Sequence, residues 1–107
     1  MMNRIRMATM ILLAASIAGP AFAETAGADF YKAQKCAMCH GADGLAATPV
    51  AKSMKVLSFK EPAMIKASDA QFIASTTNGK GKMPAYKGKL TDPQIKDVVA
   101  YIRTLQK

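Results

Sequence analysis

The most regular pattern of apolar positions lies at the end of the chain. After residue 94 the apolar residues fall on one stripe at helical spacing: Ile95, Val98, Val99, Ile102 and Leu105. Thr91 and Gln94 stand at the spacing of a capping box, and Leu90 is placed to form a hydrophobic staple with Ile95. Pro93 is compatible with this start because the first turn of a helix does not use its N–H groups. The pattern predicts a closing helix that begins just after Thr91.

Two further stretches are predicted to be helical, and no stretch shows the alternation typical of a strand. Residues 29–35 (DFYKAQK) run into a pair of cysteines, and one helix is expected to continue through that pair. Residues 68–78 open with another capping box, Ser68 and Gln71, and end at Asn78-Gly79, a typical helix stop. The segments 41–49 and 79–88 are rich in small residues, glycine and proline, and predict loops. The chain is therefore predicted to be all-α.

The first 23 residues have the layout of a secretory signal peptide. Arg4 and Arg6 precede an apolar run, residues 7–17, and the small-residue site Ala21-Phe22-Ala23 follows. A retained membrane anchor is the alternative, but the run is shorter than the roughly 20 residues that a spanning helix needs, and Gly19-Pro20 interrupts it. We therefore expect cleavage after Ala23, export to the periplasm without stable membrane insertion, and a single domain over residues 24–107.

Size and charge narrow the choice of function. With the leader removed, the chain has 13 basic residues, 12 of them lysine, and 7 acidic residues, which gives a formal net charge of +6. A domain this small buries only about 60–65% of its unfolded surface, and such domains usually need disulfides, a metal or another inserted group. Nucleic acid is not an expected partner, because aromatic and basic residues do not interleave and the protein is expected to be exported.

Both cysteines and the one histidine of the chain stand together in KCAMCHG, residues 35–41. Cys36-x-x-Cys39-His40 is the spacing for covalent haem attachment. Positions three apart share a helix face, so both thiols can add to vinyl groups on one porphyrin edge while His40 ligates the iron. Three alternatives are less consistent with the sequence. A structural zinc site needs four protein ligands, a thioredoxin-like dithiol needs a βαβ setting, and a plain disulfide leaves His40 without a role.

The second axial ligand is sought among the methionines that follow the leader: Met38, Met54, Met64 and Met83. Met38 lies between the attachment cysteines and cannot reach the opposite face of a haem. Met54 and Met64 are interpreted as core-filling residues. Met83 stands in a Gly- and Pro-rich segment that can cross a flat face in extended form before the closing helix. Met83 is therefore the expected ligand, and a thioether opposite imidazole raises the reduction potential and leaves no open site for dioxygen.

Taken together, these features resemble the class I c-type cytochromes, especially their short bacterial and algal members. The resemblance rests on CAMCHGADG near the start, NGKGKMPAYKGKL later, and LTDPQIKDVVAYIRTL at the end. It implies a small cytochrome c fold, with about three to five short helices around one covalently attached haem c. It also implies a soluble carrier of single electrons between larger respiratory or photosynthetic proteins, and not an enzyme.

The resemblance assigns roles to individual residues. It makes Cys36 and Cys39 the thioether cysteines. His40 is then the proximal ligand of the iron, and Met83 is the distal one. The carbonyl of Pro49 is implied as the acceptor for the histidine Nδ1–H, a bond that fixes the orientation of the ring.

The resemblance also implies a contact between the first and last helices. Tyr101 is expected to pack across the first helix, against Ala28 as a small residue and against an aromatic one. Tyr31 is out of register for that aromatic role, because it stands one residue further from Cys36 than the family usually has it. The role of Tyr86 is open: it covers the haem edge or a propionate, or it fills a loop.

Lysines crowd the segment that carries Met83: Lys80, Lys82, Lys87 and Lys89. They are expected to form a positive rim, with Lys52 and Lys55 nearby, that steers a monomeric protein to a larger redox partner with an acidic docking surface. A solvated face without a partner is the alternative. Two other functions stay open. One is a haem enzyme or gas-binding protein in which Met83 dissociates, and the other is a cytochrome subunit of a larger dehydrogenase or oxidase.

Overall fold

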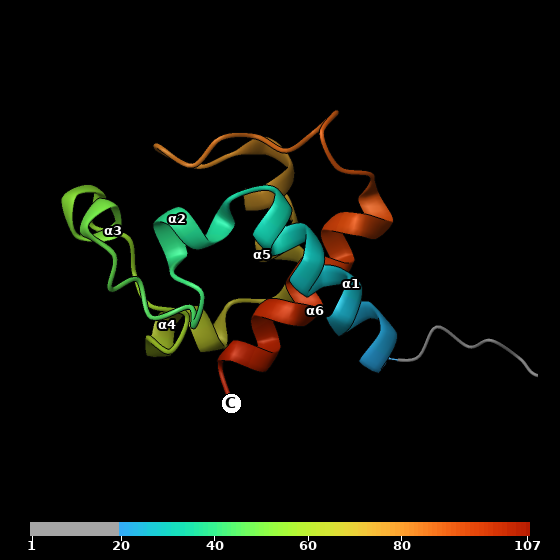
Figure 1. Cartoon of the computed structure of the whole chain (residues 1–107), viewed down its shortest axis with the longest axis horizontal. Coiled ribbons are helices and arrows are strands. Elements are labelled where there is room, and N and C mark those ends of the chain that lie inside the picture. The colour runs from blue at the N-terminus through green and yellow to red at the C-terminus, as the bar shows by residue number, and fades with distance from the viewer. Residues whose placement is uncertain (1–19) are drawn as a thin grey trace, which may run out of the picture.

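The structure, a computed structural model, describes residues 20–107, and within them six α-helices are joined by loops (Figure 1). The helices are α1 (Pro20–Ala33), α2 (Cys36–His40), α3 (Pro49–Met54), α4 (Pro62–Lys66), α5 (Asp69–Asn78) and α6 (Asp92–Leu105). These residues form no strand, only two isolated bridges, and the all-α prediction is confirmed. The short helices α3 and α4 occur where no helix was predicted, and each begins with a proline in its first turn.

The predicted leader lies outside the described residues except for its last four, which form the first turn of α1. No helix within residues 20–107 is long and apolar enough to cross a membrane.

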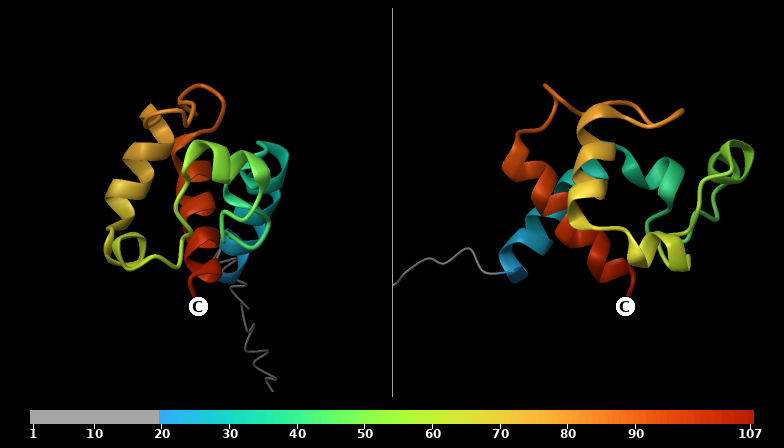
Figure 2. Two further views of the ribbon diagram at one scale, coloured as in Figure 1. Left: turned by 90° about the vertical axis from the view of Figure 1, so that its left-hand side faces the viewer. Right: turned by 180° about the vertical axis from the view of Figure 1, so that it is seen from behind.

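The most extensive contact between described helices is that of α1 with α6, which cross each other (Figure 2). The two helices come closest at Gly27. A Cβ at position 27 would overlap the carbonyl group of Asp97 and lie 2.9 Å from the Cβ of Tyr101, so only glycine permits this approach. One turn further on, Tyr31 packs edge-on against Tyr101, with ring centroids 5.2 Å apart. Tyr101 therefore packs across α1 as expected. The small residue is Gly27 and not Ala28, because Gly27 shares a helix face with Tyr31.

A break at Lys35 separates α1 from α2, so the prediction of one helix continuing through the cysteine pair is wrong. Lys35 adopts a left-handed conformation, with φ 61° and ψ 27°. Its amide donates to Lys32 O, and its carbonyl accepts from the amide of Met38. Because the helix is interrupted at Lys35, the additional residue between Tyr31 and Cys36 does not shift the register of α1 against α6. Tyr31 can therefore meet Tyr101 while α2 keeps an orientation of its own.

Local sequence signals account for the starts of α5 and α6. Ser68 and Thr91 cap these helices, and both capping boxes are complete, as predicted from their spacing. Arg103 of α6 then ties α5 to the closing helix. Its Nε lies 2.8 Å from Asp69 Oδ1, and its guanidinium stacks 4.6 Å from the ring centroid of Phe72. The two helices are thereby held side by side at their junction with α4.

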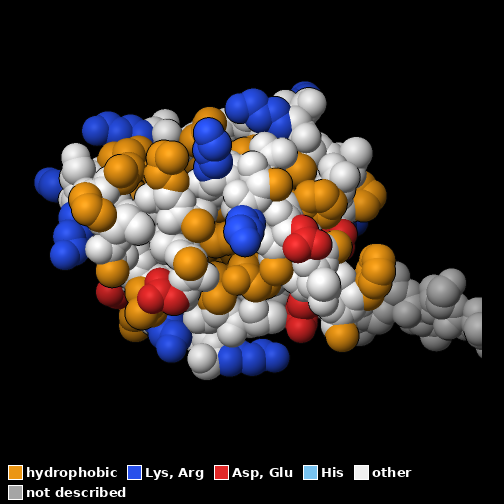
Figure 3. Space-filling model, in the orientation of Figure 1, with side chains coloured by type: hydrophobic (Ala, Val, Ile, Leu, Met, Phe, Trp, Pro, Cys, Tyr) orange, Lys and Arg blue, Asp and Glu red, His pale blue; other side chains and the backbone are white. Residues whose placement is uncertain are grey.

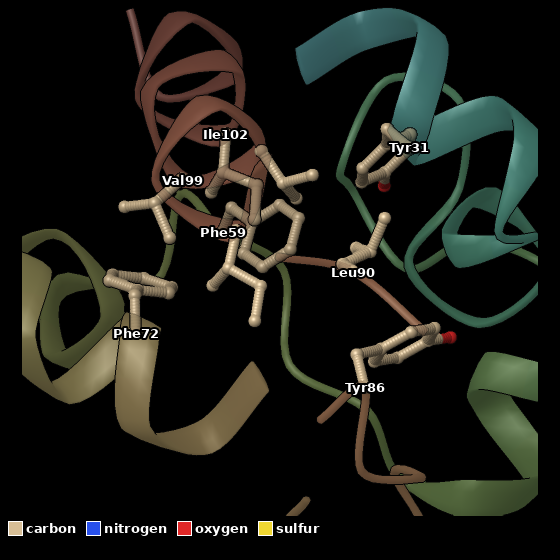
Figure 4. Packing of buried hydrophobic residues seen from close by; sticks show 9 residues of the cluster. Tyr31, Phe59, Phe72, Tyr86, Leu90, Val99 and Ile102 are labelled. Atoms are coloured by element: carbon tan, nitrogen blue, oxygen red, sulfur yellow. The ribbon is translucent and has the colours of Figure 1, made fainter. Parts of the chain in front are cut away.

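The core lies between α1, α5 and α6 and is closed by loop residues (Figure 4). The closing helix contributes four buried side chains, Ile95, Val98, Val99 and Ile102, from the stripe predicted for it. Phe59, from the loop before α4, packs edge-on to Phe72 with centroids 6.1 Å apart. α3 stands at one end of the molecule, and α2 is its only helix neighbour among the described elements (Figure 1).

Candidate functional site

One cavity of about 1140 Å³ is enclosed by α2, α5, α6 and the loops between them. Its walls are mostly apolar and include aromatic side chains from four parts of the chain: Tyr31, Phe59, Phe72 and Tyr86. Cys36, Cys39, His40 and Met83 all line this cavity. The structure thus brings the sequence motif of α2 and the distant methionine to one space.

The two cysteines reach the cavity because α2 carries them on one turn. Both are half-buried, and neither forms a disulfide. Burial raises the pKa of the Cys36 thiol, although the nearby hydroxyl of Tyr86 acts in the opposite direction. No group of three or more His, Cys, Asp or Glu side chains within residues 20–107 is arranged to hold a metal ion, which does not favour the zinc alternative.

His40 ends α2, and its backbone is fixed because its carbonyl accepts from the amide of Ala46 at 2.9 Å. Its ring stacks on Phe59, with centroids 4.7 Å apart and an interplanar angle of 18°. Burial lowers the pKa of this imidazole and so favours the neutral form, which is the form that binds metals. The Nδ1 atom is buried without a hydrogen-bond partner. A buried polar atom of this kind indicates a function that packing alone does not explain.

Met83 lies in the segment 79–90, which turns back on itself before α6. The amide of Lys80 donates to Met83 O at 3.1 Å, and the amide of Met83 donates to Lys80 O at 2.9 Å. Gly79 permits this tight return, since it has φ 78° and a Cβ there would lie only 2.7 Å from Met83 O. The tight turn presents the half-buried Met83 side chain to the cavity.

Pro49 does not contact the histidine through a hydrogen bond. It is an exposed residue in the first turn of α3, and the structure shows no bond between its carbonyl and His40. Thr48, just before it, caps α3 and also donates from Oγ1 to Met38 O at 2.9 Å. Thr48 therefore joins α3 to α2, a connection that the sequence pattern did not indicate.

The lysines divide into two groups around the cavity. Lys80 and Lys82 line it, whereas Lys87 and Lys89 are exposed without lining it. Three lysines from other segments also line it: Lys35, Lys55 and Lys66. In the orientation of Figure 1, basic side chains lie along the left, upper and lower edges of the molecule and also within the face between them (Figure 3). Lys35 and Lys66 were missed by sequence reasoning because only the tertiary fold brings them to the cavity.

Comparisons with known proteins place this arrangement in a family. The family model described as cytochrome c oxidase, cbb3-type, subunit III, matches residues 22–102. The cytochrome c6 of Nostoc sp. is 41% identical over 76 residues, which are 71% of this chain and 65% of that protein. The cytochrome c6 of Synechocystis sp. is 40% identical over 70 residues, 65% of this chain and 56% of that protein. The match therefore spans less than two thirds of the length of these two relatives.

A third relative, the cytochrome c6 of Gloeothece citriformis, is 36% identical over 96 residues, which are 87% of this chain and 83% of that protein. The chain therefore belongs to the family of the matching model, cytochrome c oxidase, cbb3-type, subunit III. It is thereby one of the small class I c-type cytochromes. Membership implies one covalently bound haem c. The resemblance inferred from the sequence motifs is confirmed.

The residues that line the cavity fit a haem c. Two thiols on one helical turn, a neutral imidazole and a thioether are suited to thioether attachment and axial ligation. The buried Nδ1 atom of His40 matches the need of a ligating histidine for a partner at its other ring nitrogen. The apolar and aromatic walls suit a large flat apolar group, and the lysines among the lining residues suit its carboxylates.

Proposed function

We propose that this chain carries single electrons between larger redox proteins by means of one haem c. In this proposal Cys36 and Cys39 attach the porphyrin through thioether bonds, and His40 and Met83 are the axial ligands of the iron. The observation that carries the proposal is the convergence of these four side chains on one apolar cavity from two distant segments. A bound haem c would supply a one-electron couple, and His40 and Met83 would hold its iron.

The surrounding side chains support this role in different ways. The stacked ring of Phe59 orients His40, and burial keeps its imidazole neutral. The apolar walls keep water from the centre, which favours a raised potential and small rearrangement on electron transfer. The partner of His40 Nδ1 in the loaded protein is expected to be a carbonyl of the loop 41–49. Pro49 is the residue that the family resemblance indicates.

Replacement of the methionines tests the axial assignment with built-in controls. Met54, Met64 and Met83 all line the cavity, but only Met83 is proposed as a ligand. Met83→Ala is expected to lower the reduction potential and to abolish the weak near-infrared band of an iron–thioether bond. Met54→Ala and Met64→Ala are expected to keep that band. Loss of the band in either control variant, or its survival in Met83→Ala, contradicts the assignment.

The attachment itself is tested by the intact mass of the exported protein from its own cells. The proposal requires the mass of the chain from residue 24 onward plus one haem. Cys36→Ala together with Cys39→Ala is expected to remove the covalent haem. A wild-type protein without added haem rules out the electron-carrier function.

We infer further that the protein is exported to the periplasm and meets its partners as a monomer with a basic face. Lys80 and Lys82 line the cavity and Lys87 and Lys89 extend the charged segment, so an acidic surface is the matching partner. Such a rim raises the encounter rate and is screened by salt.

Hexacyanoferrate(III), a small anionic oxidant, serves as the probe for the lysine rim. Its oxidation of the reduced protein is expected to slow as ionic strength rises. Lys82→Glu is expected to reduce the low-salt rate more than Lys107→Glu, which makes the same charge change at the C-terminus. Equal effects of the two substitutions, or a rate that is independent of salt, contradict the rim. Purification of the protein only as part of a stable oxidase complex would instead indicate a subunit.

A further inference from the structure

Tyr86 connects the methionine-bearing segment 79–90 to the opposite side of the cavity. Its side chain is 7% exposed, and its hydroxyl donates to Gln34 O at 3.2 Å. Gln34 belongs to the turn between α1 and α2, just before the first cysteine. The same hydroxyl also lies close to the Cys36 thiol, so both of its neighbours outside the segment belong to the start of α2 and the turn before it.

Backbone hydrogen bonds hold another part of the segment on the α5 side of the cavity. The amides of Tyr86 and Lys87 donate to Thr76 O and Thr77 O, at 2.9 and 3.0 Å, at the end of α5. These bonds fasten the segment to the α5 side of the cavity. The Tyr86 hydroxyl adds a polar attachment on the α1–α2 side, three residues beyond Met83.

The acceptor at Gln34 is available because of the break at Lys35. In a continuous helix the carbonyl of Gln34 would accept from the amide of Met38, four residues later. Here the amide of Met38 donates to Lys35 O instead. The additional residue between Tyr31 and Cys36 therefore has a second consequence: it frees a carbonyl at the point that the Tyr86 hydroxyl reaches.

We propose that Tyr86 is a positioning residue, whose hydroxyl fastens the Met83 segment to the α1–α2 turn and thereby holds the methionine in its ligating position. The proposal rests on the proposed function, since it takes Met83 as the distal ligand. The ring of Tyr86 packs beside Leu90 in the core (Figure 4). The ring therefore contributes packing, whereas the hydroxyl contributes the hydrogen bond to Gln34. Tyr86→Phe separates the two, because it keeps the ring and removes only the hydroxyl.

The test is a titration of the oxidised haem-loaded protein with imidazole, which competes with the thioether for the iron. Tyr86→Phe is expected to bind imidazole about two- to tenfold more tightly than the wild type, because a less firmly held Met83 is easier to displace. This range corresponds to the loss of one neutral hydrogen bond. The near-infrared band of the iron–thioether bond reports the displacement. Thr104→Val is the matched control, because Thr104 Oγ1 also donates to a backbone carbonyl, Tyr101 O at 2.6 Å, but lies in α6 and does not line the cavity. Its imidazole affinity is expected to stay at the wild-type value.

Amide hydrogen exchange gives a second measurement that does not depend on imidazole. Tyr86→Phe is expected to speed exchange at the amides of Lys80 and Met83 several-fold, while Val98 and Val99 in α6 keep their wild-type rates. Unchanged imidazole affinity together with unchanged exchange at Met83 overturns the role of Tyr86. An equal increase in affinity in Thr104→Val overturns it as well, by showing a general loss of stability. A wild-type protein that lacks the near-infrared band overturns the proposed ligand itself, so the two failures are distinguishable.

Discussion

At position 27 the absence of a side chain decides how closely α1 and α6 approach. The carbonyl of Asp97 occupies the space that a Cβ would need. Gly27→Ala is therefore expected to push the helices apart and to lower the free energy of unfolding by about 1–3 kcal/mol. Chemical denaturation of the haem-loaded protein measures the change. Ala28→Ser, on the adjacent helix face, is the control, and it is expected to cost only about 0.5 kcal/mol. Similar decreases in the free energy of unfolding in both variants would show that the close contact of α1 with α6 does not depend on Gly27.

A second residue, Tyr31, makes the stability of the fold sensitive to alkaline pH. Burial raises the pKa of its hydroxyl, which also donates to Gly41 O at 2.6 Å, above the ordinary value of 10.0. The folded state therefore keeps the proton at a pH where the unfolded chain releases it. The stabilisation is fully present below pH 10 and is lost as the pH rises toward the higher pKa of the folded state.

Comparison of the wild type with Tyr31→Phe isolates this effect. At pH 8 the wild type is expected to be more stable by about 1 kcal/mol, the usual net value of a hydrogen bond. Above pH 10 this difference is expected to shrink by up to about 1.4 kcal/mol per pH unit. Urea unfolding between pH 8 and 11 measures both variants. A difference that stays constant up to pH 11 would show that the hydroxyl ionises equally in both states.

At the scale of the elements, the α1–α2 junction concentrates strain in one residue. Lys35 holds a left-handed conformation that costs a residue with a side chain about 1–2 kcal/mol. Lys35→Gly is expected to relieve this strain and to raise the free energy of unfolding by about 0.5–1 kcal/mol, after allowance for the flexibility of glycine in the unfolded chain. Lys32→Gly is a matched control: it removes the same charge from the last turn of α1 and is expected to destabilise the protein by about 0.5–1 kcal/mol. If both substitutions lower the free energy of unfolding, the left-handed conformation of Lys35 does not strain the folded protein.

The same junction shows which elements the sequence could predict. The capping boxes at Ser68 and Thr91 and the apolar stripe of α6 are local signals, and the structure confirms them. The break at Lys35 has no local signal, since lysine favours neither a turn nor a left-handed conformation. It arises because Tyr31 must meet Tyr101 while α2 faces the cavity, which is a constraint of the tertiary fold. The small residue of the helix crossing was misplaced by one position for the same reason.

The candidate site also contains residues that the sequence could predict and contacts that it could not. Cys36, Cys39 and His40 were predicted from their spacing and Met83 from the composition of its segment, and all four line the cavity. The stacking of Phe59 on His40 and the bond from Tyr86 to Gln34 join residues far apart in the chain. No spacing rule indicates such contacts, so they could be found only from the structure. A group of candidate residues on one turn of helix can therefore be predicted from the sequence, whereas the distant side chains that contact it cannot.

At the scale of the whole molecule, the core and the cavity share their side chains. Six of the buried core residues also line the cavity: Tyr31, Phe59, Phe72, Tyr86, Val98 and Ile102. Protein atoms already cover most of each of these side chains, and only a small part of each borders the cavity. A domain of this size is marginally stable even with a complete core, so the group that fills the cavity is expected to complete the packing.

It follows that folding and haem attachment should be coupled in this protein. The Cys36→Ala, Cys39→Ala variant is expected to lose most of its helix content and its cooperative thermal transition, as measured by circular dichroism. The wild-type chain produced without haem is the control for the substitutions themselves, and it is expected to be equally unfolded. If only the variant is unfolded, the cysteines matter for packing and not for attachment. Native-like helix content with cooperative melting in both proteins would mean that α1, α5 and α6 form a sufficient core, and that the haem is added to a fold that does not need it.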